Sequence, residues 1–137
     1  MAEWRRREVL RALAVALTAG CASDDEPKVE ISELTVVNRR EENVEVTVIA
    51  DRGGETVYED TFEFDPKRGG STDGVHLEEG WMSGEGNLEV TISADSIDEA
   101  SLSTKSLARE REDDGCLSVF STVDERGVSV YRADVDC

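Results

Sequence analysis

The feature of this sequence that most constrains its fold is a repeated alternation of apolar and polar residues with a period of two. The alternation is clearest at Val44, Val46 and Val48, and it returns over residues 88–92 and 128–135. A period of two places successive side chains on opposite faces of a β-strand. No segment after residue 28 shows a sustained helical period, so the body of the chain is predicted to consist of strands.

The spacing of these segments predicts the architecture. They recur at roughly ten-residue intervals and are separated by turn residues, which is typical of β-sandwiches. Asp51-Arg52-Gly53-Gly54 supplies glycines that adopt positive φ, so a hairpin is expected there. We therefore predict an all-β fold, an immunoglobulin-like antiparallel β-sandwich of seven or eight strands over residues 29–137, with a small closed barrel as the alternative. The expected strands lie within residues 29–37, 44–49, 56–64, 75–77, 88–92, 100–107, 116–123 and 128–135.

Two of the three cysteines lie in the last predicted hairpin. Pairing Val123 with Val128 fixes the register of this hairpin. Cys116 then faces Val135, and Cys137 lies two residues further along on the same face. A diagonal pair is slightly long for a disulfide, so a bulge or a frayed strand end is needed to close it. We predict a Cys116–Cys137 disulfide, which closes a loop of about 22 residues and stabilises the fold by roughly 3 kcal/mol on the chain-entropy model.

Acidic residues far outnumber basic ones. The chain has 32 Asp and Glu against 15 Lys and Arg, a net charge of -17. Residues 1–21 contain four of these bases and two of these acids, so residues 22–137 carry 30 acids, 11 bases and a net charge of -19. No nucleic-acid partner is expected, because affinity for phosphate backbones comes from clustered Lys and Arg. Abundant acids with only three lysines favour a protein of concentrated salt, and an ordinary acidic exported protein is the alternative.

The first 21 residues have the pattern of an export signal. Arg6, Arg7 and Leu10 resemble the twin-arginine signal, whose usual form is Arg-Arg-x-Phe-Leu-Lys; Val9 stands for the Phe and Arg11 for the Lys. The apolar run that follows covers residues 12–20, whereas a bilayer span needs about 20 apolar residues. Residues 1–21 are therefore predicted to be a helical signal peptide. An amphipathic helix packed on the domain is the alternative, but it leaves the adjacent arginines unexplained.

The end of this segment resembles a lipobox. In Leu17-Thr18-Ala19-Gly20-Cys21, small residues precede a cysteine whose thiol would be joined to lipid, although bacterial lipoboxes usually have Leu where Thr18 stands. The resemblance implies lipidation of Cys21 and attachment to the membrane. Residues 22–28 are then expected to be a short acidic tether. One acyl chain gives only marginal membrane affinity, so a second chain or another signal is expected as well.

The leader, Cys21, the acidic tether and the strand-rich body, which approaches its last cysteine through Asp113-Asp114-Gly115-Cys116, together resemble small haloarchaeal lipoproteins with an immunoglobulin-like domain. The resemblance implies a place at the outer face of the cell membrane and a β-sandwich fold. It implies little chemistry, because such proteins are mostly of unassigned function.

Residues that suggest catalysis or metal binding are few. His76 is the only histidine, and its neighbours Ser71 and Asp73 do not form a nucleophile elbow. Two thiols and one imidazole do not make a tetrahedral zinc set, and a blue-copper site needs two histidines. The acidic loops 95–99 and 110–114 lack the ligand spacing of an EF-hand. We therefore predict no catalytic residue, no metal and no cofactor.

Trp81 and Met82 are the candidate recognition residues. They are adjacent, and we expect one in the core and one at the surface. A Trp exposed on a loop suits binding of a protein or glycan, whereas a Trp that seals the end of the sandwich is the alternative.

We expect a non-enzymatic, lipid-anchored binding or accessory module of a halophilic cell envelope, with an unknown protein or glycan partner. The first alternative is an extracellular hydrolase or inhibitor domain, which a buried His76 beside a Ser and an Asp would favour. The second is a structural envelope protein that self-associates, which a large apolar patch or an unprotected strand edge would favour.

The excess of carboxylates predicts that salt stabilises the fold. The Debye length falls from about 8 Å at physiological ionic strength to about 3 Å in 1 M salt, so added KCl screens the repulsion among acidic side chains. Thermal unfolding of the full chain in about 0.1 M and about 2 M KCl measures this effect, and we expect the higher Tm in the concentrated salt. An unchanged Tm would contradict adaptation to salt.

Overall fold

The structure is a computed structural model, and it describes residues 27–137. The export-signal residues Arg6, Arg7 and Leu10, the lipidation residue Cys21 and all but the end of the predicted tether lie outside the described residues. The elements are β1 (Val29–Asn38), β2 (Val44–Arg52), β3 (Glu55–Phe64), β4 (Asp73–Leu77), the 3-10 helix η1 (Gly80–Met82), β5 (Leu88–Ala94), β6 (Asp98–Ser103), α2 (Thr104–Ala108), β7 (Gly115–Asp124) and β8 (Gly127–Val135).

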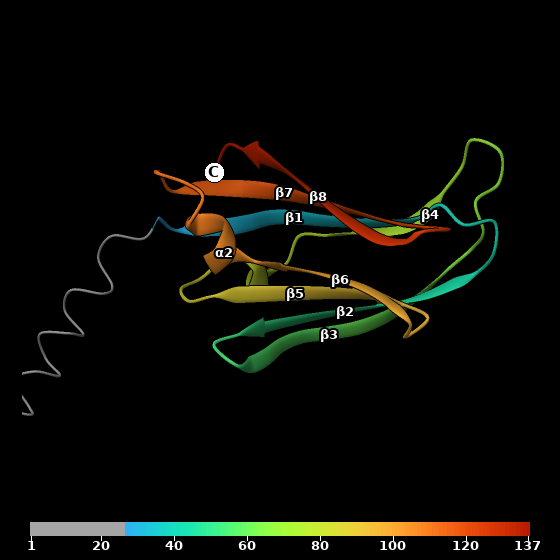
Figure 1. The fold of residues 1–137 in the computed structure, drawn as a ribbon, viewed down its shortest axis with the longest axis horizontal. Helices are drawn as coiled ribbons and strands as arrows, with labels where there is room; N and C mark the ends of the chain where they lie inside the picture. Colours follow the sequence, from blue (N-terminus) through green and yellow to red (C-terminus); the bar gives the residue numbers. More distant parts are fainter. Residues whose placement is uncertain (1–26) are drawn as a thin grey trace, which may run out of the picture.

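Eight strands form two sheets of four, with the orders β4-β1-β7-β8 and β3-β2-β5-β6. The sheets lie one above the other as two layers (Figure 1). The predicted all-β sandwich is confirmed at this level, and the sheets do not join into the closed barrel that was the alternative. The chain passes from one sheet to the other between β1 and β2 and again between β3 and β4.

The core lies between the two sheets and follows from the alternation in the sequence. Strand β2 buries every second residue from Val44 to Ala50, and β5 does the same from Leu88 to Ala94. Opposite them, the other sheet contributes apolar side chains that are likewise almost fully buried, among them Leu34, Val36, Val119 and Val123. Each buried aliphatic side chain of this size contributes about 1.5–3 kcal/mol relative to exposure. The polar residues between them face solvent, so the pattern itself separates core from surface.

One pairing differs from the predicted antiparallel sheets. Strands β1 and β7 run parallel, with Val36 opposite Ser121, while the other strand pairs are antiparallel. The reason lies in the connection before β7: β6 and α2 bring the chain back to the start of β1. There the Gly115 amide donates to the Lys28 carbonyl (3.0 Å) and the Lys28 amide donates to Asp114 Oδ1 (2.7 Å). Strand β7 therefore starts beside β1 and runs in the same direction.

The strand expected over residues 100–107 is wrong in its second half. Strand β6 ends at Ser103, and α2 follows directly. The Ser103 hydroxyl accepts a hydrogen bond from the Ser106 amide, which caps the new helix. Leu107 and Ala108 are both buried. Two adjacent buried residues suit a turn of helix, because buried and exposed residues alternate in a strand with one face in solvent.

The last hairpin has the predicted register. Val123 pairs with Val128 and Cys116 pairs with Val135. Strand β8 ends at Val135, and the residues beyond it bring Cys137 to Cys116 with the two Cα atoms 5.3 Å apart, where they form the predicted disulfide. The end of the strand thus supplies the adjustment that a diagonal pair needs.

The sandwich has two distinct ends. We call the near end the one where residues 27–29 lead into β1, together with η1, α2 and the start of β7. The far end carries the loops 39–43, 65–72, 95–97 and 125–126, which we call the far-end loops. In Figure 1 the near end lies at the left and the far end at the right. Within residues 27–137, no helix has the length and apolar character needed to cross a membrane.

Candidate functional site

Asn38 holds two of the far-end loops together. It is the last residue of β1, one residue beyond the strand expected over residues 29–37, and its side chain is fully buried. Its amide nitrogen donates to the carbonyls of Glu42 and Asp65, each at 3.0 Å. Its Oδ1 accepts from the Arg40 amide at 2.9 Å. All the polar atoms of this buried side chain are therefore engaged, which fixes loop 39–43 against the start of loop 65–72.

Arg40 extends this arrangement to the other two loops. Only 12% of its side chain is exposed. Its Nε donates to the Asp124 carbonyl (2.8 Å), and its two terminal nitrogens donate to Asp95 (3.3 Å) and Asp98 (3.0 Å). Because the guanidinium is a planar fork of donors, one side chain joins the β1–β2 loop to the β5–β6 and β7–β8 turns. We call Asn38 and Arg40 the loop clamp.

The β5–β6 turn presents an apolar side chain on a rigid support. Asp95 and Ser96 both have positive φ, 52° and 59°, as the central residues of a tight hairpin turn do. The Asp95 carboxylate also accepts from the Glu45 amide (3.0 Å), so the clamp and this bond hold the turn in place. Ile97, which follows, is 83% exposed. An isoleucine displayed in this way is suited to contact with a partner, although single exposed apolar residues are also common on surfaces.

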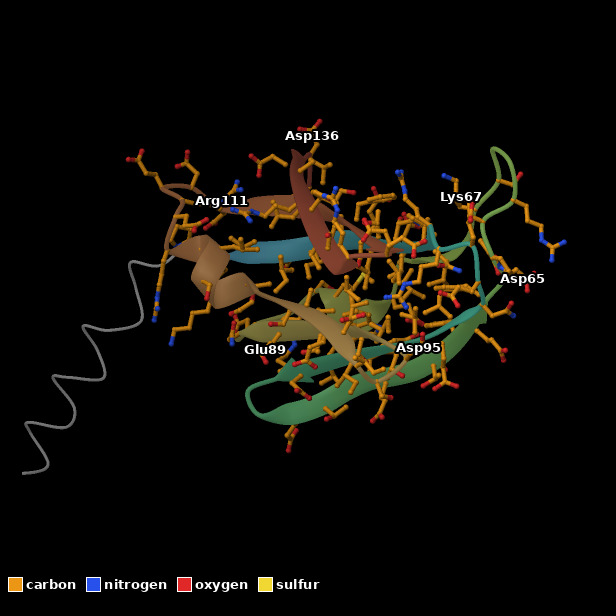
Figure 2. All side chains as sticks on the ribbon, turned by 45° about the vertical axis from the view of Figure 1, so that its right-hand side comes forward. Asp65, Lys67, Glu89, Asp95, Arg111 and Asp136 are labelled. Atoms are coloured by element: carbon orange, nitrogen blue, oxygen red, sulfur yellow. A yellow bond between two sulfur atoms is a disulfide. The ribbon has the colours of Figure 1, made fainter. Side chains whose placement is uncertain are left out.

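Basic side chains are also displayed at this end. Loop 65–72 projects beyond the sheets, with Asp65 and Lys67 at the end of the molecule opposite Arg111 (Figure 2). Lys67 and Arg68 are exposed, as are Arg39 and Arg126, and none of the four takes part in an ion pair within residues 27–137. The far-end loops of this acidic chain thus carry exposed cations and, on a different turn of the same end, an exposed aliphatic side chain. The sequence contained these residues, but nothing in it placed them together.

The predicted recognition pair lies at the other end. Met82 is buried, at 3% exposure, and Trp81 is half-buried against the core. The Trp81 ring stacks on Tyr58 with centroids 4.9 Å apart, and its indole nitrogen donates to Glu79 (3.0 Å). Burial, followed by the charges of Glu79 and Asp60, raises the pKa of the Tyr58 hydroxyl above its ordinary value. The pair therefore seals the near end, with Met82 in the core as one of the two residues was expected to be.

Arg52 fastens the loop that carries this pair. Its guanidinium donates to four backbone carbonyls, those of Trp81 (2.7 Å), Ser83 (3.2 Å), Glu85 (3.0 Å) and Gly86 (3.3 Å). One guanidinium thereby satisfies four carbonyls of the same loop. This loop therefore covers the core at the near end.

His76 lies on the outer face of the β4-β1-β7-β8 sheet. Its side chain is 49% exposed, its Nδ1 shares a hydrogen bond with the Thr35 hydroxyl (2.8 Å), and its Nε2 lies 3.4 Å from Glu33 and 3.5 Å from Glu78. These partners come from β1 and from the residue after β4, and the sequence analysis did not identify them. A clue was available only from the register, which sets Thr35 opposite His76.

The two residues considered as catalytic partners of His76 are engaged elsewhere. The Asp73 carboxylate accepts from the amides of Asp65 and Gly74, and Ser71 pairs with Arg68 through its backbone. Of the acidic loops considered for calcium, one has Asp95 and Asp98 bound to Arg40, and the other has Glu110 paired with Arg132.

Comparison of the chain with protein-family models, with curated proteins and with solved structures found no match. Functional inference therefore rests on the chemistry and placement of the residues.

Removing the loop clamp should destabilise the protein. We expect Arg40→Ala to lower the free energy of unfolding by about 2 kcal/mol, because three hydrogen bonds are lost and two of their acceptors are carboxylates that are partly exposed. Arg68→Ala is the matched control: it removes the same charge from the same end without a side-chain partner, and it should change the stability by less than about 0.5 kcal/mol. Urea unfolding of the full chain measures both, and equal losses in the two variants would show that Arg40 acts only through its charge.

Proposed function

We propose that this chain is an exported, lipid-anchored lipoprotein whose sandwich is a binding or accessory module at the outer face of the cell membrane. The attachment is through Cys21, and the signal is the segment with Arg6 and Arg7. The partner is a protein or glycan of the cell envelope, contacted through the far-end loops. No catalytic step is part of this proposal.

The observation that carries the proposal is the opposite placement of the near end and the far-end loops. The described chain leads into β1 at one end, and β1 has ten residues, so at about 3.3 Å per residue the far end lies roughly 30 Å away. A module held at its near end would present its far-end loops away from the membrane. Loops on a rigid scaffold are the usual carriers of recognition, and here the loop clamp pre-organises them, which lowers the ordering cost of binding.

The far-end loops also have suitable chemistry for a partner in an acidic envelope. Ile97 offers apolar contact, and Lys67 and Arg68 offer charge that carboxylates or sulfated and uronic sugars would accept. Electrostatic attraction of this kind chiefly sets the orientation and rate of encounter. In concentrated salt it is screened, so the apolar contact would carry more of the affinity.

Two alternative functions have less support from the described residues. For a hydrolase or inhibitor, the described residues give His76 a threonine and two glutamates as neighbours instead of a serine and an aspartate. For a self-associating envelope protein, one observation is favourable: β8 is at the edge of its sheet and exposes Tyr131 and Val135. Charged Arg132 and Asp134 alternate with them, which discourages edge-to-edge pairing.

We also propose that the sandwich is of the immunoglobulin-like type and that the chain is adapted to concentrated salt. An immunoglobulin-like type is supported by two packed sheets linked by crossovers, while the parallel β1–β7 pair departs from the all-antiparallel pattern. Adaptation to concentrated salt is supported by the net charge of the chain, -17.

Export and anchoring are tested with the full chain expressed in a halophilic host. We expect mass spectrometry of the membrane fraction to find a mature protein that begins at a lipid-modified Cys21. Cys21→Ser should move the exported protein into the medium, because the thiol that receives the lipid is gone. The double variant Arg6→Lys, Arg7→Lys should keep the chain inside the cell, since it retains the charge but not the arginine pair.

Arg5→Lys is the matched control, because it makes the same exchange next to the pair and should leave export unchanged. An intact, unmodified chain that still begins with Met1 would contradict the proposal. So would a Cys21→Ser protein that stays in the membrane fraction.

A further inference from the structure

A second cluster of polar side chains lies on the outer face of the β4-β1-β7-β8 sheet, away from the far-end loops. It consists of Glu33 on β1, His76 on β4 and Glu78 just after β4. One ligand atom from each lies within 4.8 Å of the others. All three side chains are accessible from solvent, with exposures of 35%, 49% and 66%. We call this set the Glu–His–Glu cluster.

Two of the three distances within the cluster match the edges of a coordination tetrahedron. Zn²⁺ binds imidazole nitrogen and carboxylate oxygen at about 2.0–2.2 Å, so neighbouring ligand atoms of a tetrahedral site lie about 3.4 Å apart. His76 Nε2 lies 3.4 Å from Glu33 Oε2 and 3.5 Å from Glu78 Oε1. The third edge joins the two carboxylates, whose ligand oxygens lie within 4.8 Å of each other. Glu78 is free to shorten it, because its side chain has no hydrogen bond within residues 27–137.

Two neighbouring hydroxyls orient the cluster. Thr35 Oγ1 lies 2.8 Å from His76 Nδ1, so it can accept a hydrogen bond from Nδ1–H, which leaves the Nε2 lone pair directed at the carboxylates. The Ser118 hydroxyl donates to Glu33 Oε1 (2.7 Å), which leaves Oε2 for another partner. Bound metals in proteins are supported in this way, with the second imidazole nitrogen and the second carboxylate oxygen held by hydrogen bonds.

The cluster also lacks a cationic side chain that would neutralise it. Within residues 27–137, the only ion-pair partner of Glu33 and Glu78 is the imidazole between them. Carboxylates elsewhere in the described residues do have such a partner: Asp95 and Asp98 pair with Arg40, and Glu110 pairs with Arg132. When Nδ1–H donates to the Thr35 hydroxyl, the Nε2 lone pair faces two negative oxygens, an arrangement that a divalent cation relieves.

We propose that Glu33, His76 and Glu78 bind a divalent transition-metal ion of the Zn²⁺ class, with a water or an external ligand in the fourth position. A nitrogen with two oxygens suits zinc better than Ca²⁺ or Mg²⁺, which prefer six or more oxygen ligands. The proposal is independent of membrane attachment and of the far-end loops.

Titration of the full chain with ZnCl₂ tests the site. The Cys21→Ser chain is used, because it removes the one thiol outside the Cys116–Cys137 disulfide. A background of about 1 M KCl and about 10 mM MgCl₂ occupies and screens the other carboxylates. We expect one Zn²⁺ per chain by calorimetry. NMR of the single histidine should show a large shift of its imidazole signals at the same stoichiometry.

Variants connect this binding to the cluster. We expect His76→Ala to weaken Zn²⁺ binding by more than tenfold and Glu78→Gln by about tenfold, because each removes one ligand. Thr35→Val should weaken it by about tenfold through loss of the orienting hydrogen bond. Glu89→Gln and Thr47→Val are the matched controls on the outer face of the other sheet, and they should bind as the parent does.

None of these side chains lies in the core, so the variants are expected to fold, and circular dichroism checks this. Zn²⁺ binding that is unchanged in His76→Ala, or imidazole signals that do not move at saturating Zn²⁺, would overturn the proposal. A failure to bind Zn²⁺ at all would do so as well, and none of these results would bear on anchoring by Cys21.

Discussion

The loop clamp at the far end is the interaction on which the functional arrangement depends. Burial of an asparagine amide with an unmet hydrogen bond costs about 1–3 kcal/mol, so the fully buried Asn38 is stable there only with its partners in place. Those partners are loop carbonyls and the Arg40 amide, and the Arg40 side chain then reaches two further turns. Segments far apart in the sequence are thereby fixed relative to one another, and Ile97 is presented from a rigid turn.

In this acidic chain, single arginine side chains each make several structural contacts. Arg40 at the far end and Arg52 at the near end each satisfy several oxygen atoms of surrounding loops. The core between the sheets is mostly aliphatic, and within residues 27–137 no Asp or Glu is buried. Repulsion among the carboxylates is thus confined to the solvated surface, where salt screens it. Stability is then a balance between a strand-built core and a surface that concentrated salt relieves.

The sequence pattern predicted those features of the fold that depend on residues close together in the chain. The alternation in β2 and β5, the glycines of the β2–β3 turn and the Cys116–Cys137 disulfide all follow from residues that are near one another in the sequence or in one hairpin. The parallel β1–β7 pair was missed because it joins strands more than 80 residues apart. The helix α2 was missed because five residues are too few to show a period. The loop clamp and the Glu–His–Glu cluster depend on register between strands, which composition does not reveal.

The most direct measurement of the central claim, that the far-end loops form one rigid unit with the sandwich, is amide hydrogen exchange resolved by residue on the full chain. The Lys67 amide donates to the Arg40 carbonyl and the Asp95 amide to the Glu45 carbonyl, each at 2.8 Å. If the clamp holds, these two loop amides exchange as slowly as those of the neighbouring strands, because they open only when the end of the sandwich opens. Exchange as fast as that of an unbonded loop amide would show that the far end is not pre-organised.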